Sequence, residues 1–324
     1  MITAYVPRDG RLAAVPCASL EDVPAEAVWL DVCAPEEATR AGLARWIGAP
    51  LPDRTDVVAI ETSERLYQAH DALVMTLVMP MVARVPDPGT SSMTLAATAR
   101  RLVSIREAEP ISIGMASKRV QSEAAGVETS NGALFILLDA IADRAADVIE
   151  ECSGTFDAIA SEVFEGKIDS RKSAIYQATI QKIGRVGVKV ARMHDSCASL
   201  ERLFLFLSLN SGTLRLSSAQ KAQCKALGRD IRSIREHASA LDAKLNFLLD
   251  ATVGLVNLEQ NQIIKIFSVL AVVFLPPTLI ASIYGMNFQG MPELDWSYGY
   301  AFSLGVMVLS VLLTFLYFRW KKLL

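Results

Sequence analysis

Residues 266–283 read IFSVLAVVFLPPTLIASI, and residues 298–318 read YGYAFSLGVMVLSVLLTFLYF. Neither stretch contains a charged side chain, and each approaches the roughly 20 residues that a helix needs to cross a hydrocarbon core. Buried helices of a soluble domain would also be apolar, but these two runs are adjacent and end in aromatic and basic residues. We therefore expect a two-helix membrane hairpin in a lipid bilayer.

The charges that flank the two runs predict their orientation. The flanking basic residues are Lys265, Arg319, Lys321 and Lys322. The segment between the runs has no Lys or Arg, but it contains Glu293 and Asp295 after the aromatic Tyr284. Because Lys and Arg concentrate on the cytoplasmic side, we expect both termini in the cytoplasm and these three residues in an external loop.

Composition excludes several other functions. The net charge of the 324 residues is -3, without a basic cluster, so no nucleic-acid partner is expected. The five cysteines form no C-x-x-C pair, which argues against a zinc site or a disulfide framework. The three histidines are isolated, and His194 to Cys197 lie too close together on one helix to converge as a triad. No phosphate loop is present, so we expect neither an enzyme nor an organic cofactor.

The rest of the chain is typical of a soluble protein. Short apolar stretches such as AVWLDV and RLVSIR alternate with helical patterns up to about residue 125, which predicts an α/β sandwich of undetermined strand order. Long helical patterns follow, and the last runs without a break into the first apolar stretch. We expect an α/β cytoplasmic domain at 1–130, long antiparallel cytoplasmic helices at 131–218, a stalk helix continuing into the first membrane helix at 219–283, an external loop at 284–297, a second membrane helix at 298–318 and a basic cytoplasmic tail at 319–324.

One face of the predicted stalk helix is unusually polar. Alternating steps of four and three residues define a polar seam: Asp250, Gly254, Asn257, Asn261, Ile264, Ser268, Ala271, Leu275, Thr278 and Ser282. A seam that only packs would favour large apolar residues. This one suits a water-filled path shared by several copies of the helix, because one hairpin cannot enclose a pore.

Two other interpretations of the polar seam remain open. Small residues also let membrane helices pack closely, and a buried Asn can fix the register of a coiled coil. Asp250 alone would most simply be a solvated carboxylate.

Two short motifs follow the first apolar run: YGMNF at 284–288 and MPEL at 291–294. In this position they resemble the signature of the CorA family of magnesium channels, and the resemblance is strongest over residues 245–324. It implies a funnel-shaped homopentamer in the bacterial inner membrane that takes up magnesium down the membrane potential. It also implies that Gly285, Met286 and Asn287 form the selectivity filter.

The resemblance implies further site residues. Asn261, Ile264, Leu275 and Thr278 carry over as pore positions, and all four lie on the polar seam. Asp250 aligns with a stalk acid at which internal magnesium closes the channel in some members. Magnesium usually keeps its water ligands, and the Asn287 amide can bind these waters without stripping them.

Two rival functions remain at this point. A transporter for zinc, cobalt or nickel from the same superfamily is one, although the intact Gly-Met-Asn triplet favours magnesium. A membrane-anchored sensor or scaffold without ion flux is the other, although an anchor has no need of Asn257, Asn261 and Thr278 on one face.

Overall fold

The computed structural model describes residues 1–53, 65–79, 91–122, 127–165, 172–286 and 296–321. Contacts divide the chain into two units, Met1–Leu249 and Asp250–Leu324. The first unit contains a sheet and several helices, and the second contains the two apolar stretches.

The first unit is built on a sheet whose seven described strands run in the order β2-β1-β3-β7-β6-β5-β4. All neighbours are antiparallel except β3 and β7, which pair in parallel with Trp29 opposite Leu102. The strands are β1 (Ile2–Arg8), β2 (Arg11–Cys17), β3 (Trp29–Cys33), β4 (Leu66–Ala69), β5 (Ala72–Met79), β6 (Ser91–Ala97) and β7 (Leu102–Arg106).

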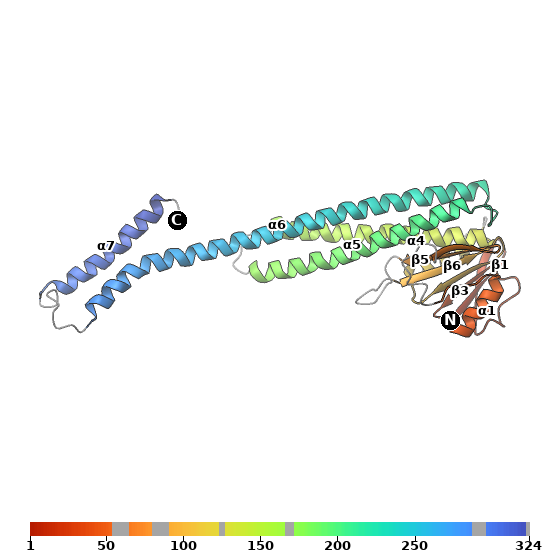
Figure 1. Cartoon of the computed structure of the whole chain (residues 1–324), viewed down its shortest axis with the longest axis horizontal. Coiled ribbons are helices and arrows are strands. Elements are labelled where there is room, and N and C mark those ends of the chain that lie inside the picture. The colour runs from red at the N-terminus through yellow and green to blue at the C-terminus, as the bar shows by residue number, and fades with distance from the viewer. Residues whose placement is uncertain (54–64, 80–90, 123–126, 166–171, 287–295, 322–324) are drawn as a thin grey trace. The chain divides into compact units, whose positions relative to one another are not determined.

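Both faces of the sheet are covered by helices. On β5, Leu73 and Met75 point into one core while Val74 points into the other, as alternation along a strand requires. Helix α1 (Glu37–Ile47) covers the second face, and α3 (Ile111–Ser122) lies with the longer helices on the first. Figure 1 shows α1 on the side of the sheet away from α4 and α5. The predicted α/β sandwich is therefore confirmed.

Three long helices complete the first unit. They are α4 (Ser130–Glu165), α5 (Lys172–Leu209) and the first part of α6 (Ser218–Tyr284). Leu241, Leu245 and Leu248 of α6 recur at helical spacing and are buried in the same core as residues of α4 and α5. Ion pairs also link these helices, for example Lys182 with Glu162 at 2.7 Å.

A buried polar network lies at the centre of the sheet. The Arg106 guanidinium donates to Asp31 at 2.9 Å, and the Ser104 hydroxyl donates to the same carboxylate at 2.7 Å. Trp29 Nε1 donates to the Ser104 hydroxyl at 3.0 Å, and its ring stacks on Tyr5 at a centroid distance of 4.0 Å. Burial opposes the charge of Arg106, but its hydrogen bonds to Asp31 outweigh this effect and raise the pKa of the guanidinium.

Several elements differ from what the sequence suggested. Residues 53–66 also have a helical sequence pattern, but residues 54–64 lie outside the described part of the chain. Strands β1, β2 and β4 and helix α3 were not expected at all. The β1–β2 hairpin turns at Asp9 (φ 51°) and Gly10 (φ 79°), where Asp-Gly fits a two-residue turn with positive φ.

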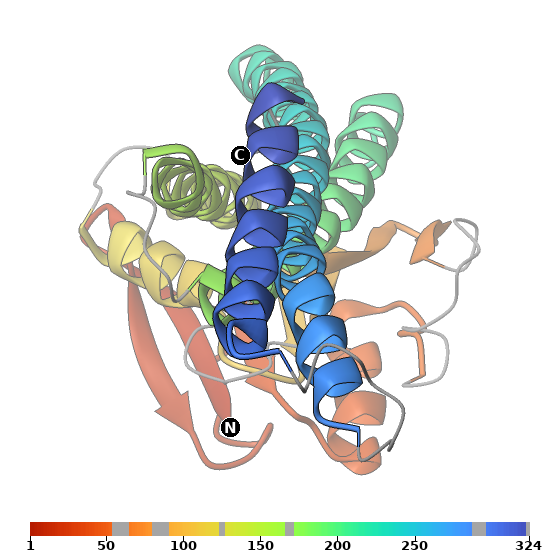
Figure 2. The ribbon, with the colours of Figure 1, turned by 90° about the vertical axis from the view of Figure 1, so that its left-hand side faces the viewer.

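The second unit is a helical hairpin. Helix α6 continues to Tyr284 with Pro276 and Pro277 inside it, and α7 spans Gly299–Trp320. Figures 1 and 2 both show α7 running back along the last part of α6. The predicted pair of membrane helices thus corresponds to one continuous long helix and one shorter helix.

Candidate functional site

The polar seam lies on one exposed face of α6. All ten of its positions, from Asp250 to Ser282, are exposed. The partly covered positions of the last turns are Val269, Val273, Pro276, Pro277, Ile280 and Tyr284. At 3.6 residues per turn, these positions lie on the side of the helix opposite to the polar seam. The face with the amides and hydroxyls is therefore left open to other molecules.

Exposure of the apolar windows excludes a core role for these helices. Both α6 and α7 contain an 18-residue stretch that is long and apolar enough to cross a membrane. In α6, 0% of this stretch is buried inside the chain, and in α7 the buried share is 6%. A core helix of this chain would be mostly buried. The alternative of two buried helices in a soluble domain is therefore wrong.

Two large apolar residues interrupt the polar part of the seam. Ile264 is 62% exposed and Leu275 is 67% exposed, so neither packs inside its own chain. Asn261, Ala271, Thr278 and Ser282 occupy neighbouring turns of the same exposed face. Copies of α6 around an axis would bring amide, hydroxyl and large apolar side chains to that axis at different depths.

The prolines locally change the hydrogen bonding of α6. Pro276 and Pro277 have no backbone N–H, so the carbonyl oxygens one turn earlier lose their helical donors. Thr278 follows directly, and its hydroxyl donates to the carbonyl oxygen of Phe274 at 2.7 Å. A side-chain hydrogen bond therefore supports the helix beside the site where backbone hydrogen bonds are missing.

The end of α6 leads into the Gly-Met-Asn motif. Tyr284 is the last helical residue, and Gly285 N–H donates to the Ala281 carbonyl oxygen at 2.9 Å. A Cβ added at Gly285 would lie 3.0 Å from the same oxygen, so the motif position favours glycine. Met286 follows with 46% exposure. The remaining predicted residues, Asn287, Glu293 and Asp295, lie outside the described part of the chain.

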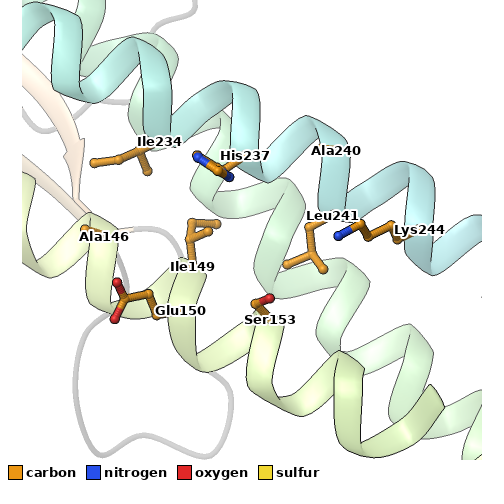
Figure 3. A pocket seen from close by; sticks show the side chains of 9 residues that line it. All are labelled: Ala146, Ile149, Glu150, Ser153, Ile234, His237, Ala240, Leu241 and Lys244. Carbon is orange, nitrogen blue, oxygen red and sulfur yellow. The ribbon is translucent and has the colours of Figure 1, made fainter. Parts of the chain in front are cut away.

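The described residues of one chain do not assemble a regulatory metal site. Asp250 is exposed, and residues within the described ranges form no group of three or more His, Cys, Asp or Glu side chains suited to a metal ion. A hollow of about 330 Å³ lies between α4 and α6. Its lining includes Glu150, His237 and Lys244, which Figure 3 shows. With one carboxylate and a lysine ammonium, this hollow does not suit a divalent cation.

The histidines do not form a catalytic arrangement. His70 lies in the turn between β4 and β5, and His194 and His237 lie on α5 and α6. On α5, His194 is exposed whereas Cys197 is buried, so the two side chains point to different environments. The sequence did not reveal that the polar seam lies opposite the covered face. The apolar positions Val269, Val273 and Ile280, at steps of four and seven, were the available signal.

Comparison with known proteins gives consistent results. A family model described as "CorA-like Mg2+ transporter protein" matches residues 24–322. The chain is 32% identical over 322 residues to the magnesium transport protein CorA of Yersinia pseudotuberculosis, with 99% of each chain covered. It is 33% identical over 298 residues to the protein of the same name from Salmonella typhimurium, with 92% of each chain covered.

A solved structure shares the fold. It is the CorA magnesium transporter from Methanocaldococcus jannaschii, which matches with a TM-score of 0.72 and 18% sequence identity. The match covers 98% of this chain and 97% of that one. The order of sheet, long helices and terminal hairpin is therefore common to both proteins.

Proposed function

Because the chain belongs to the CorA-like Mg2+ transporter family, we propose that several copies of it form a channel that carries magnesium through a central path lined by α6. The family consists of transporters, so the chain is not an enzyme. Magnesium is the cargo of this path and not a resident cofactor.

The exposure of the polar seam is the observation that carries the proposal. Ten seam positions are exposed on α6, and the partly covered positions of its last turns lie on the opposite side. In a bilayer, hydroxyls such as those of Ser268, Thr278 and Ser282 are costly unless they face water or other polar groups. Cyclic assembly with the seam toward the axis satisfies them, and we propose a homopentamer, as the sequence resemblance implied.

We propose that the filter lies at the external end of α6, at Gly285, Met286 and Asn287. Magnesium dehydrates reluctantly and usually keeps several waters. A ring of Asn287 amide oxygens would accept hydrogen bonds from these waters. Neutral amides hold the ion more weakly than carboxylates, and conduction requires sites that release the ion. Glu293 and Asp295 in the external loop would attract cations to this end.

Below the filter, we propose that Leu275 and Ile264 act as the gate. Both are large, apolar and more than 60% exposed. Rings of such residues can stop ions by excluding water from a narrow passage. Ion entry needs no ATP, because two positive charges that cross about 100 mV gain about 4.6 kcal/mol.

Orientation and regulation follow from charge. Arg319, Lys321 and Lys322 favour the cytoplasmic side, so the first unit would also lie in the cytoplasm of the bacterial cell. Asp250 is exposed on the seam, and copies of it would repel one another around an axis. We propose that internal magnesium relieves this repulsion and favours the closed arrangement of the gate.

Ion uptake by cells that lack other magnesium routes tests the proposal. Cells with the chain should accumulate magnesium and grow in low-magnesium medium, whereas cells with Asn287→Ala should not. Gln181→Ala is a matched control, because it removes an exposed amide of α5 far from the seam in sequence and should leave uptake unchanged. Accumulation of zinc, cobalt or nickel without magnesium would assign another cargo, and absence of any flux would favour a membrane-anchored scaffold.

A further inference from the structure

A cationic groove lies between α5 and α6 in the first unit. Its hollow has a volume of about 340 Å³, which falls in the range of about 300–1,000 Å³ that is common for small-molecule sites. Its lining includes Arg202, Leu205, Ser208, Lys225 and Arg232. This groove lies outside the polar seam, and the proposed transport function does not use it.

Acidic side chains leave most of this positive charge unneutralised. Glu201 is the carboxylate in the lining, and its Oε2 lies 3.0 Å from Nη1 of Arg235 in an ion pair. Arg232 is further away, with Nε 3.9 Å from Glu201 Oε1. Within the described ranges, Arg202 and Lys225 have no ion-pair partner. The groove therefore presents two unpaired cations beside a third that is only weakly paired.

Further cations lie beside the groove. Burial lowers the pKa of the Arg65 guanidinium, and the charge of Arg202 lowers it further, so these two cations repel each other. A second hollow of about 220 Å³ shares Ser208 and Lys225 with the groove and adds Lys221. An anion that binds here would relieve repulsion between like charges and meet donors from both helices.

We propose that this cationic groove binds a small polyphosphate anion in its metal-free form, with a nucleoside triphosphate or inorganic polyphosphate as the two possible sources. Guanidinium and ammonium groups form charge-assisted hydrogen bonds with phosphate oxygens, and Arg202 can do so with two oxygens at once. The Ser208 hydroxyl adds a neutral donor. Leu205, which is 62% exposed, offers an apolar surface for a base or ribose.

The positive charge of the groove favours the metal-free form of the polyphosphate over its magnesium complex. Magnesium bound to a polyphosphate neutralises two of its negative charges, so the metal-free anion interacts more strongly with Arg202, Lys225 and Arg232. Occupancy of the groove should therefore fall as magnesium rises. Binding does not depend on magnesium conduction by α6, so it can be tested separately.

Isothermal titration of the purified full-length chain tests this proposal. ATP and inorganic tripolyphosphate are titrated in parallel, first with a chelator and then with excess magnesium. We expect binding of at least one of them with the chelator, and binding at least tenfold weaker with magnesium. Tighter binding of ATP would identify a nucleotide, tighter binding of tripolyphosphate would identify inorganic polyphosphate, and equal binding would show that the phosphates alone are recognised.

Three variants locate the binding. Arg202→Ala and Lys225→Ala should each weaken binding at least tenfold, and both side chains are exposed, so thermal unfolding should be unchanged. Arg185→Ala removes another exposed α5 cation, outside the groove, and should bind like the unmodified chain. The proposal is overturned if neither anion binds, if magnesium strengthens binding, or if all three variants bind equally.

Discussion

The hydroxyl of Thr278 donates a 2.7 Å hydrogen bond to the carbonyl oxygen of Phe274 on the preceding turn of α6. This bond uses the hydroxyl hydrogen, so the two lone pairs of the oxygen remain for other donors. Waters bound to magnesium are strong donors. Thr278 is exposed on the polar seam, so in the proposed pore its oxygen would accept hydrogen bonds from a hydrated ion.

Replacement of this hydroxyl should slow transport without unfolding the hairpin. Thr278→Val keeps the shape of the side chain but removes the acceptor, and we expect magnesium flux into proteoliposomes to fall several-fold. Thr278→Ser should retain most of the flux. Thr314→Val is the matched control, because the Thr314 hydroxyl makes a similar 2.8 Å bond to the Ser310 carbonyl on α7, away from the seam. Equal losses in Thr278→Val and Thr314→Val would contradict the assigned role.

Gly285 should be intolerant of a side chain. In Gly285→Ala the new Cβ would lie 3.0 Å from the Ala281 carbonyl oxygen, so the end of α6 must shift. We expect at least a tenfold loss of magnesium flux with normal expression and assembly. In Gly305→Ala on α7 the Cβ would meet nothing within 4 Å, and flux should be normal. Normal flux in Gly285→Ala would show that the filter does not depend on this geometry.

The Asp31–Arg106 pair should be important for the stability of the first unit. The side chains are only 3% and 9% exposed, and Asp31→Ala would leave the guanidinium buried without its partner. Breaking a buried pair in this way costs about 3–5 kcal/mol. Chemical denaturation followed by circular dichroism measures the loss. Lys182→Ala breaks an exposed pair with Glu162 and should cost less than about 1 kcal/mol.

Buried thiols should make the first unit sensitive to alkaline pH. Burial raises the pKa of Cys197 from 9.0 to about 12, so the folded chain keeps this proton where the unfolded chain has lost it. The resulting stability is complete below pH 9 and is lost between pH 9 and 12, at about 1.4 kcal/mol per pH unit. Cys197→Ala should remove this part of the pH dependence when unfolding is compared across the range.

Thiol labelling is a second test of the burial of these cysteines. At pH 8, the buried Cys197 and Cys224 should react with an aromatic disulfide reagent only upon unfolding, whereas the partly exposed Cys33 should react in the folded chain. Fast labelling of Cys197 in the native protein would contradict its burial.

Helices and strands with a strong local pattern of apolar residues could be predicted from the sequence. The long apolar runs, the unbroken helical pattern before them and strands such as β3 and β7 follow from periodicity alone. The β1–β2 hairpin was missed although Asp9-Gly10 is a recognisable turn signal, because the flanking strands contain proline and arginine. The order of strands was not predictable, because the parallel pairing of β3 with β7 joins segments about 70 residues apart and depends on the packing of both faces.

The candidate site was only partly predictable for a similar reason. Spacing identified the seam from Asp250 to Ser282, but spacing alone does not distinguish a lumen from a packed interface. Exposure of the seam opposite Val273 and Ile280 adds only that the seam does not pack inside its own chain. The cationic groove at Arg202 and Lys225 has no motif, because its residues come from two helices and meet only in the folded unit.

Magnesium entry into proteoliposomes under an imposed membrane potential tests the central claim most directly. With the purified chain and an inside-negative potential, a trapped magnesium indicator should report entry that accelerates as the potential increases. The Asn287→Ala chain, reconstituted at equal density, should admit far less. Entry no faster than in protein-free liposomes, or equal entry through the Asn287→Ala chain, would contradict the proposal that this chain forms a magnesium channel with its filter at Gly285-Met286-Asn287.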